Sequence, residues 1–175
     1  TPLCNLALNS QTSKYIQLIN NAYNIDATSV LFEGTLGSIM TLNDLFATED
    51  KIDHKIDLAS LGFITVKANN AFVTDISTPA AANNDYTRIL NAVELVSNNW
   101  SINLHGTFDW TETNAAASWA LGNDGIVSPT DDYAVYVPAN LNGITFTAPE
   151  GLGFASISGP GDLPNANLEG VMAFE

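Results

Sequence analysis

The clearest hydrophobic pattern in the chain is a strict alternation over residues 100–110, "WSINLHGTFDW". Every second position is apolar or glycine, namely Trp100, Ile102, Leu104, Gly106, Phe108 and Trp110. A period of two predicts a strand with one buried face. Because aliphatic residues interleave with the aromatic ones on that face, we expect it to pack against a second layer rather than to form an exposed sugar-binding platform.

Further short strands are predicted on both sides of this segment. The runs "YAVYVPA", "GITFTAPEG", "GFASISG" and "GVMAFE" start near positions 133, 144, 154 and 170 and are separated by Gly, Pro and Asn. Residues 63–67 and 72–76, joined by "ANNA", read as a hairpin. Regular short strands favour a β-sandwich or jelly-roll-like fold, and a β-solenoid is the alternative.

Three segments have helical spacing instead. Ser13 is positioned to cap a helix with apolar positions Tyr15, Ile16, Ile19 and Tyr23. Thr41 is positioned to cap a second helix over "TLNDLFATED". The third covers residues 85–97, with Asp85 as its cap and a buried stripe of Ile89, Leu90, Val93 and Val96.

Taken together, these patterns predict a mainly β fold with minor α content, a helical segment near the N-terminus and one helix around 85–97. We treat residues 1–175 as a single β-rich domain, with residues 1–50 as a candidate N-terminal helical or assembly segment.

Charge narrows the range of partners. Five basic residues face nineteen acidic ones, and the formal net charge is −14. No Lys or Arg follows Arg88, although ten acidic residues do. Such a chain is poorly suited to neutralise phosphates, so we expect no nucleic-acid partner. Anionic membrane surfaces would repel it, and no apolar run reaches membrane-spanning length, so we expect no direct membrane insertion.

The best metal candidate is the acidic loop "GNDGIVSPTDDY". Asn123, Asp124, Asp131 and Asp132 supply hard oxygen ligands that suit Ca²⁺ better than a transition metal. The loop lacks the frame of an EF-hand, and an acidic turn without an ion is the competing interpretation. We expect no other cofactor.

Catalytic signatures are absent from the sequence. His54 in "KIDHKID" is expected in a solvated polar turn, and His105 on the exposed polar face of its strand. No serine stands at the centre of a G-x-S-x-G turn. Asp109 and Glu112 flank Trp110, so a glycoside hydrolase-like enzyme is kept as the third hypothesis. We predict no catalytic residues and no enzymatic activity.

The remaining features favour a structural role. The segments "TPLCNLALNS" and "GVMAFE" are apolar and strand-competent, so they are candidates for terminal strand exchange between copies, with pairing inside the same sheet as the alternative. The single cysteine, Cys4, excludes an intrachain disulfide. Asn99 begins an N-glycosylation sequon. The low lysine content and abundant Asn, Thr, Ser, Ala and Gly suggest an extracellular, cell-surface or virion-surface location.

We therefore predict a self-assembling subunit of an extracellular filament, surface layer or virus particle, with other copies of itself as its partners. The alternative is a carbohydrate-binding module or adhesin, with or without a requirement for Ca²⁺, that binds glycans through Trp100, Trp110 and Trp119.

Overall fold

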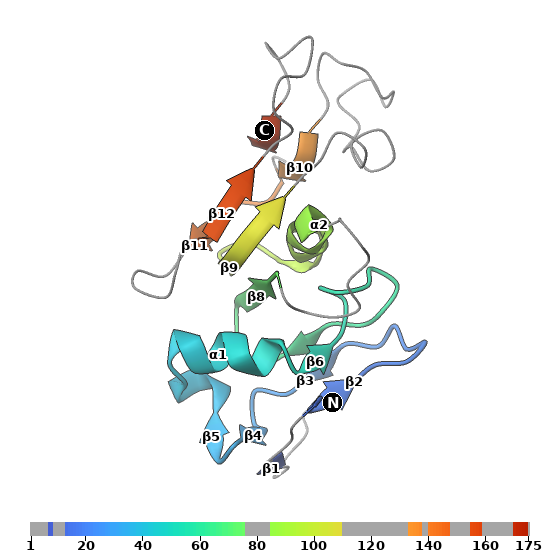
Figure 1. Cartoon of the computed structure of the whole chain (residues 1–175), viewed down its shortest axis with the longest axis vertical. Coiled ribbons are helices and arrows are strands. Elements are labelled where there is room, and N and C mark those ends of the chain that lie inside the picture. The colour runs from blue at the N-terminus through green and yellow to red at the C-terminus, as the bar shows by residue number, and fades with distance from the viewer. Residues whose placement is uncertain are drawn as a thin grey trace.

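A computed structural model describes residues 7–8, 13–75, 85–109, 133–137, 140–147, 155–158 and 170–174. The described strands are β1 (Ala7–Leu8), β2 (Ile16–Gln17), β3 (Ile25–Asp26), β4 (Leu31–Phe32), β5 (Thr35–Leu36), β6 (Ile52–Asp53), β7 (Ile64–Thr65), β8 (Asn70–Thr74), β9 (Ser101–Asp109), β10 (Tyr133–Val137), β11 (Thr145–Thr147), β12 (Ala155–Ser158) and β13 (Gly170–Phe174). The helices are α1 (Leu42–Glu49) and α2 (Asp85–Leu95), with a 3-10 turn over Gly37–Ile39. The described part is thus mixed α/β (Figure 1).

Strand pairing is mostly parallel. Only β4 and β5 form an antiparallel pair among the described strands, joined by a tight turn in which Glu33 and Gly34 have φ of 48° and 80°. The other described pairs, all parallel, are β1–β4, β2–β6, β3–β7, β8–β9, β9–β11, β9–β12 and β10–β13. Sandwiches and jelly rolls are built from antiparallel strands, so these ladders are not clearly those of a β-sandwich.

The prediction of a hairpin over 63–67 and 72–76 is also wrong, because the strands in these two segments do not pair with each other. Strand β7 pairs with β3, where Ile64 lies opposite Ile25, whereas β8 pairs with β9, where Asn70 lies opposite Ser101. Both segments contain strands, but each hydrogen-bonds to a distant part of the chain. Local β propensity identifies an extended segment without choosing its partner.

The expected helix beginning after Ser13 is also wrong. The amide of Tyr15 donates to the Lys51 carbonyl at 2.7 Å, and that of Leu18 donates to the Asp53 carbonyl at 2.9 Å. These amides therefore bond to a neighbouring segment rather than to the preceding helical turn. Ile19 and Tyr23, two of the apolar positions of the expected helix, are 72% and 82% exposed.

Pairing along this segment extends beyond the short strands. Gly62 donates its N–H to the Asn21 carbonyl, and Ala27 donates to the Thr65 carbonyl. Residues 15–27 therefore lie alongside residues 51–65, in parallel, over most of their length. A side chain at Gly62 would collide with the backbone of Tyr23, so glycine is required for this close approach.

Helix α1 confirms the expectation for residues 41–50. The Thr41 hydroxyl accepts the Asp44 N–H at 3.3 Å and caps the helix, which ends at Glu49. Leu45 and Phe46 are buried on one face, and the Phe46 ring meets Phe72 of β8 edge to face at 5.8 Å.

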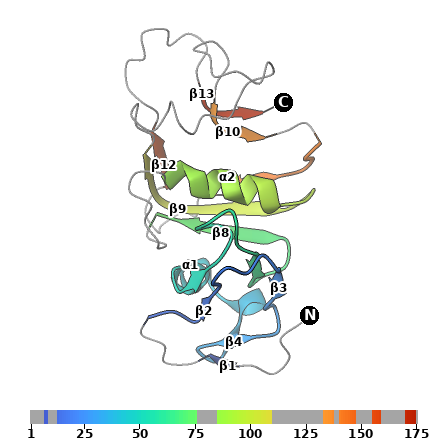
Figure 2. The same cartoon turned by 90° about the vertical axis from the view of Figure 1, so that its right-hand side faces the viewer.

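Helix α2 confirms the helix expected at 85–97, although it ends at Leu95. It connects β8 to its parallel neighbour β9, and Figure 2 shows it lying between β9 and β10. Ile89, Val93 and Val96 are buried as expected, and Leu90 is half-buried.

Strand β8 separates two apolar cores. Ala71 and Val73 pack with α2 and β9, while Phe72 points into the core that contains α1 and the N-terminal strands. Successive side chains of a strand point to opposite faces, so one five-residue strand serves both cores.

The alternating segment is strand β9, and its predicted burial is confirmed for the described residues. Ile102, Leu104 and Phe108 are buried in the α2 core, and half-buried Trp100 packs against the same core. Trp110 lies outside the described residues. Strands β10 to β13 confirm the four expected near 133, 144, 154 and 170.

Candidate functional site

The first candidate site is formed by the two terminal strands. Strand β1 pairs with β4 and strand β13 pairs with β10, so both bond within the chain. Within the described residues each has a single neighbour, and Figures 1 and 2 place the two strands at opposite ends of the long axis. Each is therefore an edge strand of the described sheets, which is where another strand is added most readily.

The orientation of β1 identifies which backbone groups face its outer edge. The Leu8 carbonyl accepts the Glu33 N–H at 2.8 Å and so points toward β4. The N–H and C=O of one residue in a strand point to the same side, and those of the next residue point to the other. The peptide groups of exposed Ala7 therefore face away from β4.

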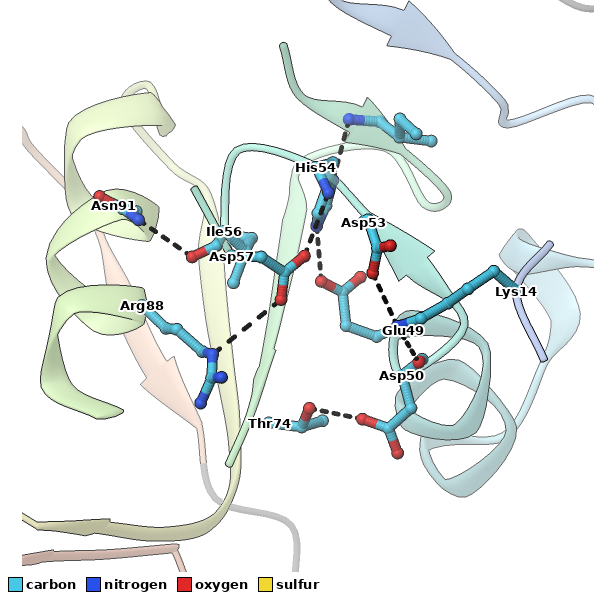
Figure 3. Close-up of polar contacts among 11 residues, drawn as sticks. Lys14, Glu49, Asp50, Asp53, His54, Ile56, Asp57, Thr74, Arg88 and Asn91 are labelled. Carbon is cyan, nitrogen blue, oxygen red and sulfur yellow. Dashed lines mark hydrogen bonds and ion pairs between the residues drawn. The ribbon is translucent and has the colours of Figure 1, made fainter. Parts of the chain in front are cut away.

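The second candidate is a buried polar cluster between the two cores (Figure 3). His54, expected in a solvated turn, has no exposed surface, and its Nε2 lies 2.6 Å from Oε1 of Glu49. The Ile64 N–H donates to Nδ1 of the same ring at 3.0 Å. Nδ1 accepts in this geometry, so the ring proton is on Nε2 and points to the carboxylate. The prediction for His54 was wrong.

A signal for this burial is present in the sequence. Ile52, His54 and Ile56 alternate through "KIDHKID", and all three are fully buried. The flanking charged residues obscure this period of two. The His54 ring also stacks on Phe63 at 5.0 Å, so the imidazole takes the place of an apolar core residue.

Asp57 is the most perturbed acid in the cluster. Its Oδ2 accepts the His54 N–H at 3.1 Å, while its buried Oδ1 has no hydrogen bond and faces Arg88 Nε at 4.0 Å. Burial, reinforced by the negative charge of Glu49, raises the pKa of Asp57 to about 7. The backbone N–H of His54 and the Arg88 guanidinium offset only part of that effect.

Both carboxylate oxygens of Asp53 have close polar partners. Its Oδ1 forms an ion pair with Lys14 Nζ at 2.7 Å, and its Oδ2 accepts from the Gln17 amide at 2.7 Å. Lys14 also donates to the Asp50 carbonyl at 3.0 Å. These contacts join residues 14–17 to residues 50–53, so the charges connect the same two segments as the backbone pairing.

The polar cluster is enclosed. Neither of the two clefts described below is lined by Glu49, His54 or Asp57. Among the described residues, no group of three or more His, Cys, Asp or Glu side chains is arranged to hold a metal ion. The arrangement therefore fits a structural role, because its groups bond to one another and to the backbone.

The third candidate is a cleft of about 600 Å³ beside Trp100. It lies where residues 22–24, the turn 55–65 and the C-terminal end of α2 meet. Its lining residues are Ala22, Asn24, Lys55, Ala59, Ser60, Leu61, Phe63, Thr65, Glu94, Leu95, Ser97 and Trp100. Half-buried Trp100 contacts Phe63, with ring centroids 6.2 Å apart.

A smaller cleft of about 360 Å³ lies between β4 and α1. There the Tyr15 hydroxyl donates to Glu33 Oε1 at 2.8 Å, and Lys51 Nζ lies 4.7 Å from the centre of the Tyr15 ring. Partial burial and the Glu33 carboxylate raise the pKa of Tyr15 to about 12.

Most of the predicted site residues lie outside the part of the chain that the structure describes. The calcium-site residues Asn123, Asp124, Asp131 and Asp132 lie outside the described residues. So do Glu112, Trp119 and Cys4, while Asp109 ends β9. Exposed Asn99 has φ of 64° and lies just before that strand.

His105 differs from its expected exposed position. It is half-buried, and its ring stacks on Phe46 of α1 at 5.0 Å. The polar face of β9 is therefore partly covered by α1, which sequence alternation alone did not indicate.

Neither a family model, nor a curated protein, nor a solved structure matches this chain. Among the described helices, neither α1 nor α2 has the length and apolar character needed to cross a membrane.

Proposed function

We propose that this chain is a non-catalytic structural protein, a subunit of an extracellular filament, surface layer or virus particle that assembles with copies of itself. The observation that carries the proposal is the parallel stacking of successive segments. Residues 15–27 lie on 51–65, β8 lies on β9, and β9 lies on β11 and β12.

This stacking also favours the β-solenoid alternative as the finer fold. In a solenoid each segment contacts only its neighbours along the axis, so the architecture has two open ends. The two-residue strands and the helix inserted between β8 and β9 make this a less regular stack than an ideal solenoid.

The proposed contact is between the outer edge of β1 in one copy and the outer edge of β13 in the next. These are different surfaces, so the contact is head-to-tail and does not close by two-fold symmetry. Repeated addition would then form a filament, or a ring if the rotation between copies allows closure. An extracellular or particle-surface location is proposed from the composition alone.

Ala7→Pro tests this contact. Proline removes the N–H of Ala7, which faces away from β4, and leaves the Leu8 pairing intact. We expect the wild-type chain to form large particles by light scattering and negative-stain microscopy, and Ala7→Pro to remain small. Ala7→Val, which keeps the N–H, is the matched control and should assemble like the wild type.

Two results would count against the proposal. A wild-type chain that stays monomeric at high concentration would exclude self-assembly as its function. Normal assembly of Ala7→Pro would exclude the β1 edge as the contact. Circular dichroism on both variants would establish that they are folded.

Calcium is tested separately by adding a chelator to the assembled wild type. Dissolution of the particles would support the predicted acidic loop, residues 123–132, as an assembly site for Ca²⁺. Unchanged particles would count against a role for Ca²⁺ in assembly and leave the strand-edge contact as the proposed one.

A further inference from the structure

The cleft beside Trp100 combines an aromatic wall with a polar rim. Trp100 is half-buried and held against Phe63, so its ring is fixed by packing. Exposed side chains around the opening carry a carboxylate, an amide and hydroxyls, from Glu94, Asn24, Ser60 and Ser97.

Two of the wall residues are positioned by backbone contacts. The Asn24 Oδ1 accepts the Phe63 N–H at 2.8 Å, which leaves the amide nitrogen of Asn24 as the donor that the side chain can offer. The backbone N–H of Trp100 donates to the Ser97 carbonyl at 3.3 Å, and this bond closes the turn after α2. The cleft therefore has a preformed shape, which lowers the ordering cost of binding.

These groups suit a neutral sugar. An aromatic ring offers a flat apolar surface to the C–H face of a pyranose, while carboxylate and amide groups bond its hydroxyls. The volume of about 600 Å³ is within the range of small-ligand sites. Lys55 and Glu94 both line the cleft, so their charges offset each other and the lining favours a neutral ligand.

We propose that this cleft binds a short neutral oligosaccharide, with one ring against Trp100 and hydroxyl contacts to Glu94 and Asn24. This binding site is independent of the proposed strand-edge contact, because none of its residues belongs to β1 or β13. The two functions are compatible: a surface assembly could display the cleft along its length.

Isothermal titration calorimetry tests the site with four probes: cellotetraose, maltotetraose, mannotetraose and chitotetraose. We expect at least one to bind with a Kd of about 1 mM or tighter. Trp100→Leu should weaken that binding by about tenfold or more, since the aromatic face is lost. Because Trp100 also packs on the core, a second variant is needed.

Glu94→Gln is that second variant, and it changes an exposed side chain. Loss of the carboxylate should weaken binding by about tenfold, the effect of a hydrogen bond to a charged group. The control is Glu33→Gln, which removes the same charge at the other cleft and should leave binding unchanged. Absence of binding by all four probes at about 10 mM, or equal weakening by both Gln variants, would overturn the proposal.

Discussion

Nε2 of His54 donates to Oε1 of Glu49 across 2.6 Å, at a place where neither side chain reaches solvent. The same ring accepts the Ile64 N–H through Nδ1, so one histidine joins α1 to β7. Buried polar groups stabilise a fold when every partner is present and destabilise it when one is removed.

Glu49→Ala should therefore be strongly destabilising. It leaves the buried N–H of His54 without an acceptor and removes packed atoms, so we expect the free energy of unfolding to fall by about 2–4 kcal/mol. Glu49→Gln keeps an acceptor oxygen and should lose less. Urea denaturation measures both, with exposed Glu94→Gln as the control. Equal losses for the Ala and Gln variants would mean that a neutral acceptor at this position does not replace the carboxylate.

Asp57 should make stability depend on pH. Its pKa is raised to about 7 in the folded chain, against about 4 in an unfolded one. Between these values the folded state holds a proton that the unfolded state has released. Its contribution to stability is therefore greatest below pH 4, falls by up to about 1.4 kcal/mol per pH unit as pH rises, and is lost above pH 7.

Asp57→Asn isolates this effect, because it removes the titrating group and keeps an acceptor for the His54 N–H. Relative to the wild type, the variant should gain stability as the pH rises from about 4 to about 7, and this gain should level off above pH 7. The difference between the two proteins is the quantity to compare, since other groups titrate in both. A difference that stays constant over this range would show that Asp57 does not titrate there.

Gly37 and Gly34 should respond differently to alanine. A Cβ at Gly37 would collide with the carbonyl of Val66, so the backbones must separate, and we expect a loss of about 3 kcal/mol. Gly34 has open space around it but φ of 80°, which costs an alanine about 1 kcal/mol. Thermal unfolding of the two variants should show the larger loss at Gly37. The reverse order would contradict the close approach of these segments.

Asn103 provides a test of the pairing between β8 and β9. Its buried amide nitrogen donates to Asn70 Oδ1 and to the Ala71 carbonyl, each at 3.1 Å. Asn103→Asp places a buried charge against two acceptors and should lower the free energy of unfolding by about 3–5 kcal/mol at neutral pH. The exposed Asn43→Asp, at the start of α1, should stay within about 0.5 kcal/mol of the wild type. A small effect at Asn103 would mean that its side chain points to solvent.

The candidate sites were only partly visible in the sequence. Trp100 was named for glycan binding from its residue type alone, and the structure adds a cleft formed by three separate segments. The buried Glu49–His54 pair was missed, since the surrounding Asp53, Lys55 and Asp57 made the segment read as a polar turn. Residue types indicate which chemistry a side chain offers, whereas its accessibility depends on the neighbours that the fold brings to it.

The sequence by itself determined the elements whose signals are local. Helix α1 follows from the Thr41 cap and its apolar face, α2 from the spacing of Ile89, Val93 and Val96, and β9 from the alternation over residues 100–110. The tertiary structure decided which segments pair with one another. The segment from Ser13 to Tyr23 was interpreted as helical from its short-range spacing, yet the amides of Tyr15 and Leu18 bond to the carbonyls of residues 51 and 53. Parallel pairing joins segments that are distant in sequence, and no local sequence pattern indicates which strand will pair with which. The short strands, whose spacing had favoured a β-sandwich, therefore pair mostly in parallel.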